Sequence, residues 1–78
     1  MNTQSTIYNI LIFKTNIKTE EDKHKIAPLL DALLSIRRWT VDCEDCDCVL
    51  RIESDNLTED EIIKLIQQGG FTCEVLND

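Results

Sequence analysis

Two threonines, each followed directly by three acidic residues, mark the starts of two helices in this chain. Thr19 precedes Glu20–Asp22, and Thr58 precedes Glu59–Glu61. A hydroxyl at the N-cap position accepts a hydrogen bond from the free N–H groups of the first turn, and carboxylates there face the positive end of the helix dipole. The sequence therefore predicts that one helix begins after Thr19 and a second after Thr58.

Apolar residues recur at helical spacing after each start. In the first segment they are Ile26, Leu29, Leu30, Leu33 and, less regularly, Leu34 and Ile36, which predicts a helix running to about Ser35. Pro28 lacks an N–H and its ring crowds the carbonyl four residues back, so we expect a bend there, or a helix whose regular part begins near Pro28. The second helix has the capping-box pattern, with a Leu57–Ile62 staple, and should end at Gly69-Gly70, where a positive φ is wanted.

Four short segments have the apolar or alternating pattern of β-strands. They are residues 8–13, 39–43, 49–54 and 71–76. The first is an Ile-rich run, so we expect a largely buried, central strand. The acidic segment between the second and third strands predicts a hairpin loop.

The order strand, helix, strand, strand, helix, strand predicts an α+β fold of the ferredoxin-like βαββαβ type, a four-stranded antiparallel sheet with two helices on one face. A chain of 78 residues allows one domain, which we place at residues 7–77, with residues 1–6 as a flexible N-terminus. In this topology residues 15–22, 43–48 and 69–73 lie at the same end of the sheet.

Charge narrows the classes of partner. Eight Lys and Arg against fifteen Asp and Glu give a net charge of -7, which repels nucleic-acid phosphates and anionic membrane surfaces. The sequence shows no secretory signal pattern and no apolar run of membrane-spanning length, so a cytoplasmic protein is expected. No recognisable arrangement of nucleophile, base and orienting group is present, nor a glycine-rich phosphate loop, so we expect no enzymatic activity.

Three of the four cysteines, Cys43, Cys46 and Cys48, lie in or beside the predicted hairpin loop. In a reducing compartment such a cluster points to metal binding, redox chemistry or plain burial. Soft thiolates suit Cu(I), which three sulfurs could hold, whereas Zn(II) wants four ligands. Candidates for a fourth ligand are Cys73, His24, an acidic neighbour such as Asp45, or a cysteine of a second copy.

Two other interpretations of the cysteines stay open. Cys43 and Cys48 bracket the loop and could face each other within the range of a disulfide. A thioredoxin-like mechanism is not expected, because the acidic turn raises the pKa of a thiol instead of lowering it. Residue by residue, inert thiols are the commonest outcome: Cys43 shares a strand face with Trp39, and Cys73 shares one with Phe71, as small core residues would.

The span from Tyr8 to Leu76 resembles a heavy-metal-associated domain, the module of copper chaperones and of the N-termini of metal-pumping P-type ATPases. The resemblance lies in the Ile-rich first strand, the helix from Thr19, the Trp39–Asp42 strand, the Thr58 helix and the Gly70-Phe71 step into the last strand. It implies the ferredoxin-like fold and, for a typical member, binding of a soft metal ion.

That family carries its metal motif, MxCxxC, at the start of the first helix. If Ile26 is aligned with the apolar residue four positions after the second family cysteine, Ile17 stands at the Met position and Thr19 and Asp22 stand at the two Cys positions. A hydroxyl and a carboxylate cannot replace two thiolates for Cu(I), and helix capping explains both residues. The hairpin cysteines lie at the same end of the fold, so a relocated metal site is geometrically allowed.

The sequence thus supports two hypotheses about function. The leading one is a small non-enzymatic heavy-metal-associated-like domain that binds Cu(I) or Zn(II) through Cys43, Cys46 and Cys48. The alternative is a metal-free, degenerate member that acts as a protein–protein interaction or oligomerisation module, with a homodimer as one form. Ferredoxin-like sheets expose one face and an edge strand, and such surfaces pair readily with a second chain.

Overall fold

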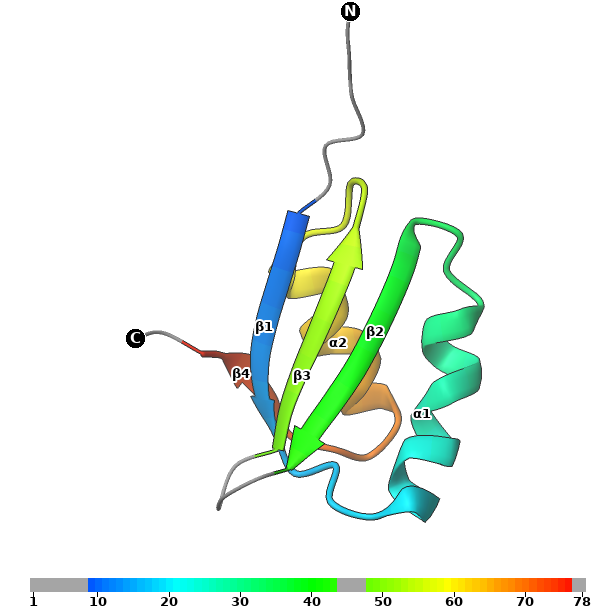
Figure 1. Cartoon of the computed structure of the whole chain (residues 1–78), viewed down its shortest axis with the longest axis vertical. Helices are drawn as coiled ribbons and strands as arrows, with labels where there is room; N and C mark the ends of the chain where they lie inside the picture. The colour runs from blue at the N-terminus through cyan, green and yellow to red at the C-terminus, as the bar shows by residue number, and fades with distance from the viewer. Residues whose placement is uncertain (1–8, 44–47, 77–78) are drawn as a thin grey trace, which may run out of the picture.

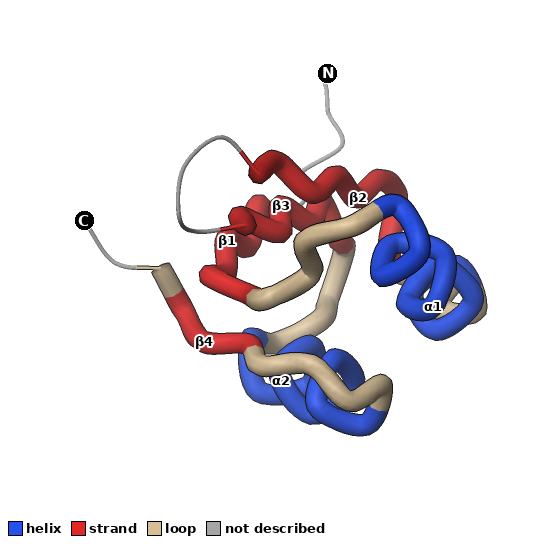
Figure 2. Tube along the Cα trace, turned by 90° about the horizontal axis from the view of Figure 1, so that it is seen from below, coloured by secondary structure: helices blue, strands red, loops and turns tan. Residues whose placement is uncertain are grey.

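The computed structural model describes residues 9–43 and 48–76. In chain order the elements are β1 (Asn9–Thr15), α1 (Glu20–Asp31), β2 (Ile36–Cys43), β3 (Cys48–Ser54), α2 (Glu59–Gln68) and β4 (Cys73–Val75). The four strands form one antiparallel sheet in the order β2-β3-β1-β4 (Figure 1). Both helices lie on the same side of this sheet (Figure 2). The fold is therefore α+β, as expected.

Both helix starts form at the threonines that the sequence indicates. The Oγ1 atom of Thr19 accepts a hydrogen bond from the N–H of Asp22 at 3.0 Å, and the Oδ2 atom of Asp22 accepts one from the N–H of Thr19 at 3.3 Å. This reciprocal pair is a complete capping box. In α2 the Oγ1 atom of Thr58 accepts from the N–H of Glu61 at 3.3 Å. A local hydrogen bond thus fixes the start of each helix.

The first helix ends earlier than its apolar spacing predicts. It stops at Asp31, with Ala32 as C-cap, and the chain then turns through two further backbone hydrogen bonds to begin β2 at Ile36. Leu34 therefore lies outside the helix with its side chain 97% exposed, so its assignment to the apolar helix face is wrong. The helix is already formed before Pro28, so the idea that its regular part begins there is also wrong.

The second helix ends where the sequence indicates. Gly69 is its C-cap, and Gly70 has a φ of 92°. A residue with a Cβ atom would be strained in that conformation, which explains the glycine. With 12 residues in α1 and 10 in α2, no helix in the described part of the chain is long and apolar enough to cross a membrane.

The two edge strands differ in length from their predictions. β2 begins at Ile36, three residues early, and an irregularity between Ile36 and Arg38 interrupts its alternating pattern, which is why the sequence did not reveal it. β4 is shorter than predicted and begins only at Cys73. The N–H of Thr72 donates instead to the side-chain Oδ1 atom of Asn16 at 2.9 Å, so that residue belongs to a loop.

The hydrophobic core lies between the sheet and the two helices. Its fully buried members are Phe13, Ile17, Ile26, Leu30, Leu50, Ile52, Ile62 and Ile66. Burying a side chain of this size contributes about 1.5–3 kcal/mol. The opposite face of the sheet has no helix over it among the described residues, so Ile10 and Ile12 on the central strand β1 remain 48% and 37% exposed. The expectation that this strand is largely buried is wrong for that face.

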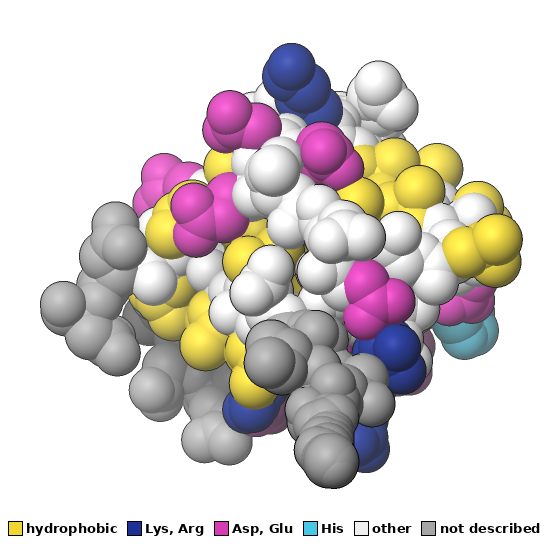
Figure 3. All heavy atoms as spheres, turned by 90° about the horizontal axis from the view of Figure 1, so that it is seen from above, with side chains coloured by type: hydrophobic (Ala, Val, Ile, Leu, Met, Phe, Trp, Pro, Cys, Tyr) yellow, Lys and Arg dark blue, Asp and Glu magenta, His cyan; other side chains and the backbone are white. Residues whose placement is uncertain are grey.

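Hydrophobic side chains also reach the surface at one end of the molecule. Seen from the end opposite the hairpin, they lie interspersed with acidic side chains (Figure 3). The mixture of the two kinds is typical of a small domain, in which there is too little polar surface to cover the whole exterior.

Ser54 offers a test of the packing at the end of β3. Its side chain is fully buried, and its hydroxyl has no hydrogen-bond partner among the described residues. Because a buried hydroxyl without a partner is destabilising, Ser54→Ala should raise the free energy of unfolding by about 1 kcal/mol. Urea denaturation measures this change, and a clear loss of stability would contradict it.

Candidate functional site

Three cysteines and one threonine form a row across the sheet at its hairpin end. The strand register places Cys43 of β2 opposite Cys48 of β3, Cys48 opposite Thr15 of β1, and Thr15 opposite Cys73 of β4. We call these four residues the cysteine row. All four occupy the positions of their strands that alternate toward the helices. Cys46, the third cysteine of the hairpin, lies outside the described residues.

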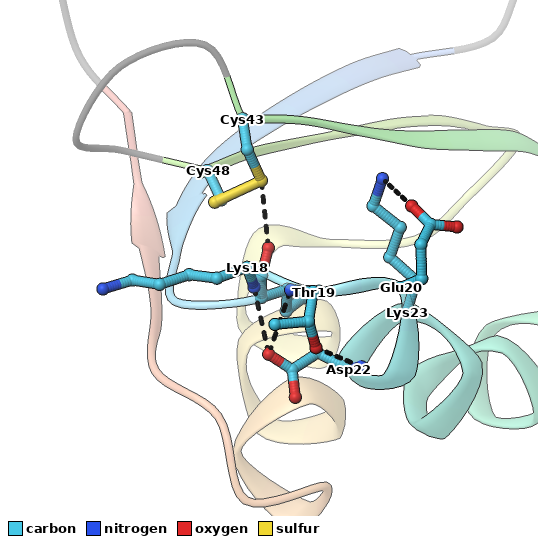
Figure 4. A network of polar contacts seen from close by, with 8 residues as sticks. Lys18, Thr19, Glu20, Asp22, Lys23, Cys43 and Cys48 are labelled. Atoms are coloured by element: carbon cyan, nitrogen blue, oxygen red, sulfur yellow. Dashed lines mark hydrogen bonds and ion pairs between the residues drawn. A yellow bond between two sulfur atoms is a disulfide. The ribbon is translucent and has the colours of Figure 1, made fainter.

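Cys43 and Cys48 are joined by a disulfide bond (Figure 4). The two residues are directly opposed in the antiparallel ladder, and their Cα atoms are 4.1 Å apart. Cys48 is buried, whereas Cys43, at the end of an edge strand, is exposed. Cys43 is therefore not the core residue that its strand face suggested.

The sulfur of Cys43 also touches the loop between β1 and α1. Its Sγ atom lies 3.1 Å from the backbone oxygen of Ile17, a contact visible in Figure 4. A disulfide sulfur carries no hydrogen, so in the oxidised protein this is a close approach and not a hydrogen bond. After reduction the thiol of Cys43 can donate a hydrogen bond to the same oxygen. Cys43 can therefore contact the loop in both the oxidised and the reduced protein.

Thr15 connects the root of the hairpin to the same loop. Its Oγ1 atom donates to the backbone oxygen of Cys48 at 2.9 Å and accepts from the N–H of Ile17 at 3.2 Å. Thr15 is buried, so both bonds are shielded from water. Sequence reasoning missed this residue because it belongs to no motif. Only the register of β1 against β3 reveals its place.

The positions aligned with the family's metal loop serve other purposes here. Ile17 is fully buried in the core, and Thr19 and Asp22 cap the first helix. The Oδ2 atom of Asp22 also accepts from the N–H of Lys18 at 3.1 Å. That bond, with smaller help from Thr19, holds the pKa of Asp22 below its ordinary value. The side chains of Thr19 and Asp22 are used in helix capping, so they do not fit a soft metal ion.

Cys73, a proposed fourth ligand, is a buried thiol. Burial, and secondarily the charge of Glu74, raises its pKa to about 11, so it is protonated at neutral pH. In the cysteine row Thr15 lies between Cys73 and Cys48. His24, another proposed ligand, is exposed on α1, and Asp45 lies outside the described residues. Within residues 9–43 and 48–76, no three His, Cys, Asp or Glu side chains are grouped to hold a metal ion.

A groove of about 480 Å³ opens beside Cys73, between the β1–α1 and α2–β4 loops. Lys14, Lys18, Asn16, Gln67 and Phe71 are among its lining residues. The hydrogen bond from the N–H of Thr72 to Asn16 holds the two loops together. The Sγ atom of Cys43 also lies against Ile17, so the described parts of the three segments expected to meet at this end of the sheet are neighbours.

Comparison with known proteins yields no relative of this chain: no family model, no curated protein and no solved structure matches it. The resemblance to heavy-metal-associated domains therefore stays a prediction.

Replacing Thr15 by valine should weaken the root of the hairpin. The change keeps the shape of the side chain but leaves the oxygen of Cys48 and the N–H of Ile17 without a partner, which should lower the free energy of unfolding by about 1–3 kcal/mol. Thr40→Val, at an exposed position of β2, is the matched control and should stay within about 0.5 kcal/mol of the wild type. Equal effects in urea denaturation would show that the Thr15 bonds are not stabilising.

The raised pKa of Cys73 predicts a loss of stability at alkaline pH. The folded state holds the thiol proton more tightly than the unfolded state, in which the pKa of the thiol is 9.0. The contribution of the protonated Cys73 thiol to the free energy of unfolding is present below pH 9.0 and is lost as the pH rises to about 11. Serine at Cys43, Cys46 and Cys48 prevents disulfide exchange during the measurement. In that background Cys73→Ala should flatten the decline, whereas parallel stability curves would contradict the assignment.

Proposed function

We propose that this protein is a small non-enzymatic domain that binds a soft metal ion through the reduced cysteines of the β2–β3 hairpin, Cys43, Cys46 and Cys48. One observation carries the proposal: Cys43 and Cys48 are directly opposed, with Cα atoms 4.1 Å apart and their sulfurs joined in a disulfide. Two thiols held so close by the sheet need little rearrangement to share one ion, because metal–sulfur bonds are about 2.3 Å long.

Oxidation and metal binding exclude each other at this pair. A disulfide offers no thiolate, so only the reduced hairpin can serve as a ligand. Reduction by a cellular dithiol transfers two electrons and two protons, breaks the bond between Cys43 and Cys48 and leaves two thiols, while the dithiol becomes a disulfide. In the cytoplasm, the compartment we propose, such reductants keep exposed cysteine pairs in the reduced, dithiol form. The exposure of Cys43 supports easy reduction.

The number of thiols in the hairpin favours Cu(I) over Zn(II). Cys46 stands two residues before Cys48 in the sequence and supplies a third thiolate, and soft thiolates select Cu(I). Zinc wants a fourth ligand. Cys73 lies two strands away from Cys48, a backbone separation of about 10 Å at the usual strand spacing, with Thr15 between them. Recruiting Cys73 would require the sheet to open, which supports a site without it.

The proposal includes a ferredoxin-like fold and a relationship to heavy-metal-associated domains. The position of β1 between β3 and β4 supports the βαββαβ arrangement. The contact between the Cys43 sulfur and Ile17, in the loop that corresponds to the metal loop of that family, supports the relationship. Because Thr19 and Asp22 are used in a capping box, the relationship requires a metal site that has moved across the end of the domain.

A metal titration of the full chain tests this function. Reduced, metal-free protein is titrated with Cu(I), and separately with Zn(II), under native mass spectrometry and against a chromophoric competitor. We expect one Cu(I) per reduced chain and none for the oxidised protein. Serine at Cys43 and Cys48 should weaken binding by roughly 100-fold or more, because even outer-shell changes cost 10–100-fold.

Cys73→Ser is the matched control, because it removes a thiol outside the hairpin and should leave the stoichiometry unchanged. Circular dichroism confirms that each variant is folded. If the chain with serine at Cys43, Cys46 and Cys48 binds Cu(I) as the wild type does, the hairpin is not the site.

A further inference from the structure

The outer edge of β2 has backbone groups available for another strand. β2 lies at one end of the sheet (Figure 1), and no described strand pairs with its outer side. The 4.1 Å separation of Cys43 and Cys48 identifies them as a non-hydrogen-bonded pair, because such pairs are about 4.5 Å apart and hydrogen-bonded pairs about 5.5 Å. Since the two kinds alternate, Val41 and Trp39 also direct their N–H and C=O groups outward.

The side chains along this edge carry opposite charges at symmetric positions. Arg38, Thr40 and Asp42 are exposed on the sheet face away from the helices. Arg38 stands two residues before Thr40, and Asp42 stands two residues after it. Between residues 38 and 43 the edge has neither a proline nor a bulge, two of the devices by which edge strands avoid association.

We propose that a second copy of this chain pairs with β2, antiparallel, about a twofold axis that passes through Thr40. Arg38 of each copy then lies directly opposite Asp42 of the other, so the contact contains this ion pair twice. Trp39 lies opposite Val41 of the other copy on the helix side. The outward N–H and C=O groups of these two residues bond across the axis, and the two sheets become one continuous sheet.

The charge pattern selects this register over its neighbours. Residues opposite each other in antiparallel strands share a face, so the axis must pass through a residue, and the nearest alternatives to Thr40 are Trp39 and Val41. An axis at Trp39 sets Arg38 against Thr40, and an axis at Val41 sets Thr40 against Asp42. Of the three, only the axis at Thr40 pairs opposite charges. Arg38 also faces Glu53 within its own sheet, so it would lie between two carboxylates.

Charge exchange on the full chain tests the dimer. Sedimentation equilibrium of the reduced protein with a chelator present should show a concentration-dependent dimer. Arg38→Asp or Asp42→Arg alone sets like charges opposite each other and should raise the dissociation constant at least about tenfold, since facing like charges are destabilising. The double variant R38D/D42R restores both ion pairs and should restore the dimer. Lys64→Asp, an equal charge change at an exposed position of α2, is the control and should leave the dissociation constant unchanged.

A crosslink fixes the register independently. In a chain whose four natural cysteines are serine, Thr40→Cys should form a covalent dimer under mild oxidation, because the two copies of residue 40 meet at the axis, whereas Arg51→Cys should not. A monomer at the highest soluble concentration would overturn the proposal, as would a dimer indifferent to the single charge changes. Because the chelator and the serine background remove the proposed metal site, failure of metal binding leaves this test intact.

Discussion

The register of β1 against β3 is the constraint on which the rest of the structure depends. It places Leu50 and Ile52 of β3 on the same face as Phe13 of β1, where the two helices cover them. The same register sets Thr15 beside Cys48, so that one hydroxyl bonds both the hairpin and the β1–α1 loop. A slip of one residue would turn Leu50 and Ile52 away from the helices and remove the bond from Thr15 to Cys48. Core and candidate site therefore form together.

Local signals in the sequence were enough to predict both helix starts and the end of the second helix. Thr19 and Thr58 act through hydrogen bonds within one turn, and Gly70 acts through its own backbone conformation. The end of α1 could not be predicted in this way, because the chain leaves the helix to begin β2. The start of β2 was hidden by the irregularity near Arg38, which breaks the alternation on which strand prediction relies.

In the candidate site, too, local features could be predicted from the sequence and long-range features could not. The opposition of Cys43 and Cys48 follows from their short separation in a hairpin and could be expected from spacing alone. The role of Thr15 could not, because its partner Cys48 is 33 residues away along the chain and no motif marks the pair. Spacing also could not show that Thr15 separates Cys73 from the other cysteines of the row. Long-range register decides both points, and a single sequence carries little information about it.

The short loop closed by the disulfide has a further consequence. Its cysteines are 5 residues apart in the chain, and in the chain-entropy model a crosslink restricts the unfolded chain least when the closed loop is small. Cys43 and Cys48 are also held together by the strand ladder. Oxidation of this pair is thus weakly linked to folding. The same folded domain can therefore exist in two chemical states at its hairpin end: a reduced state with nucleophilic sulfur and an oxidised state with none.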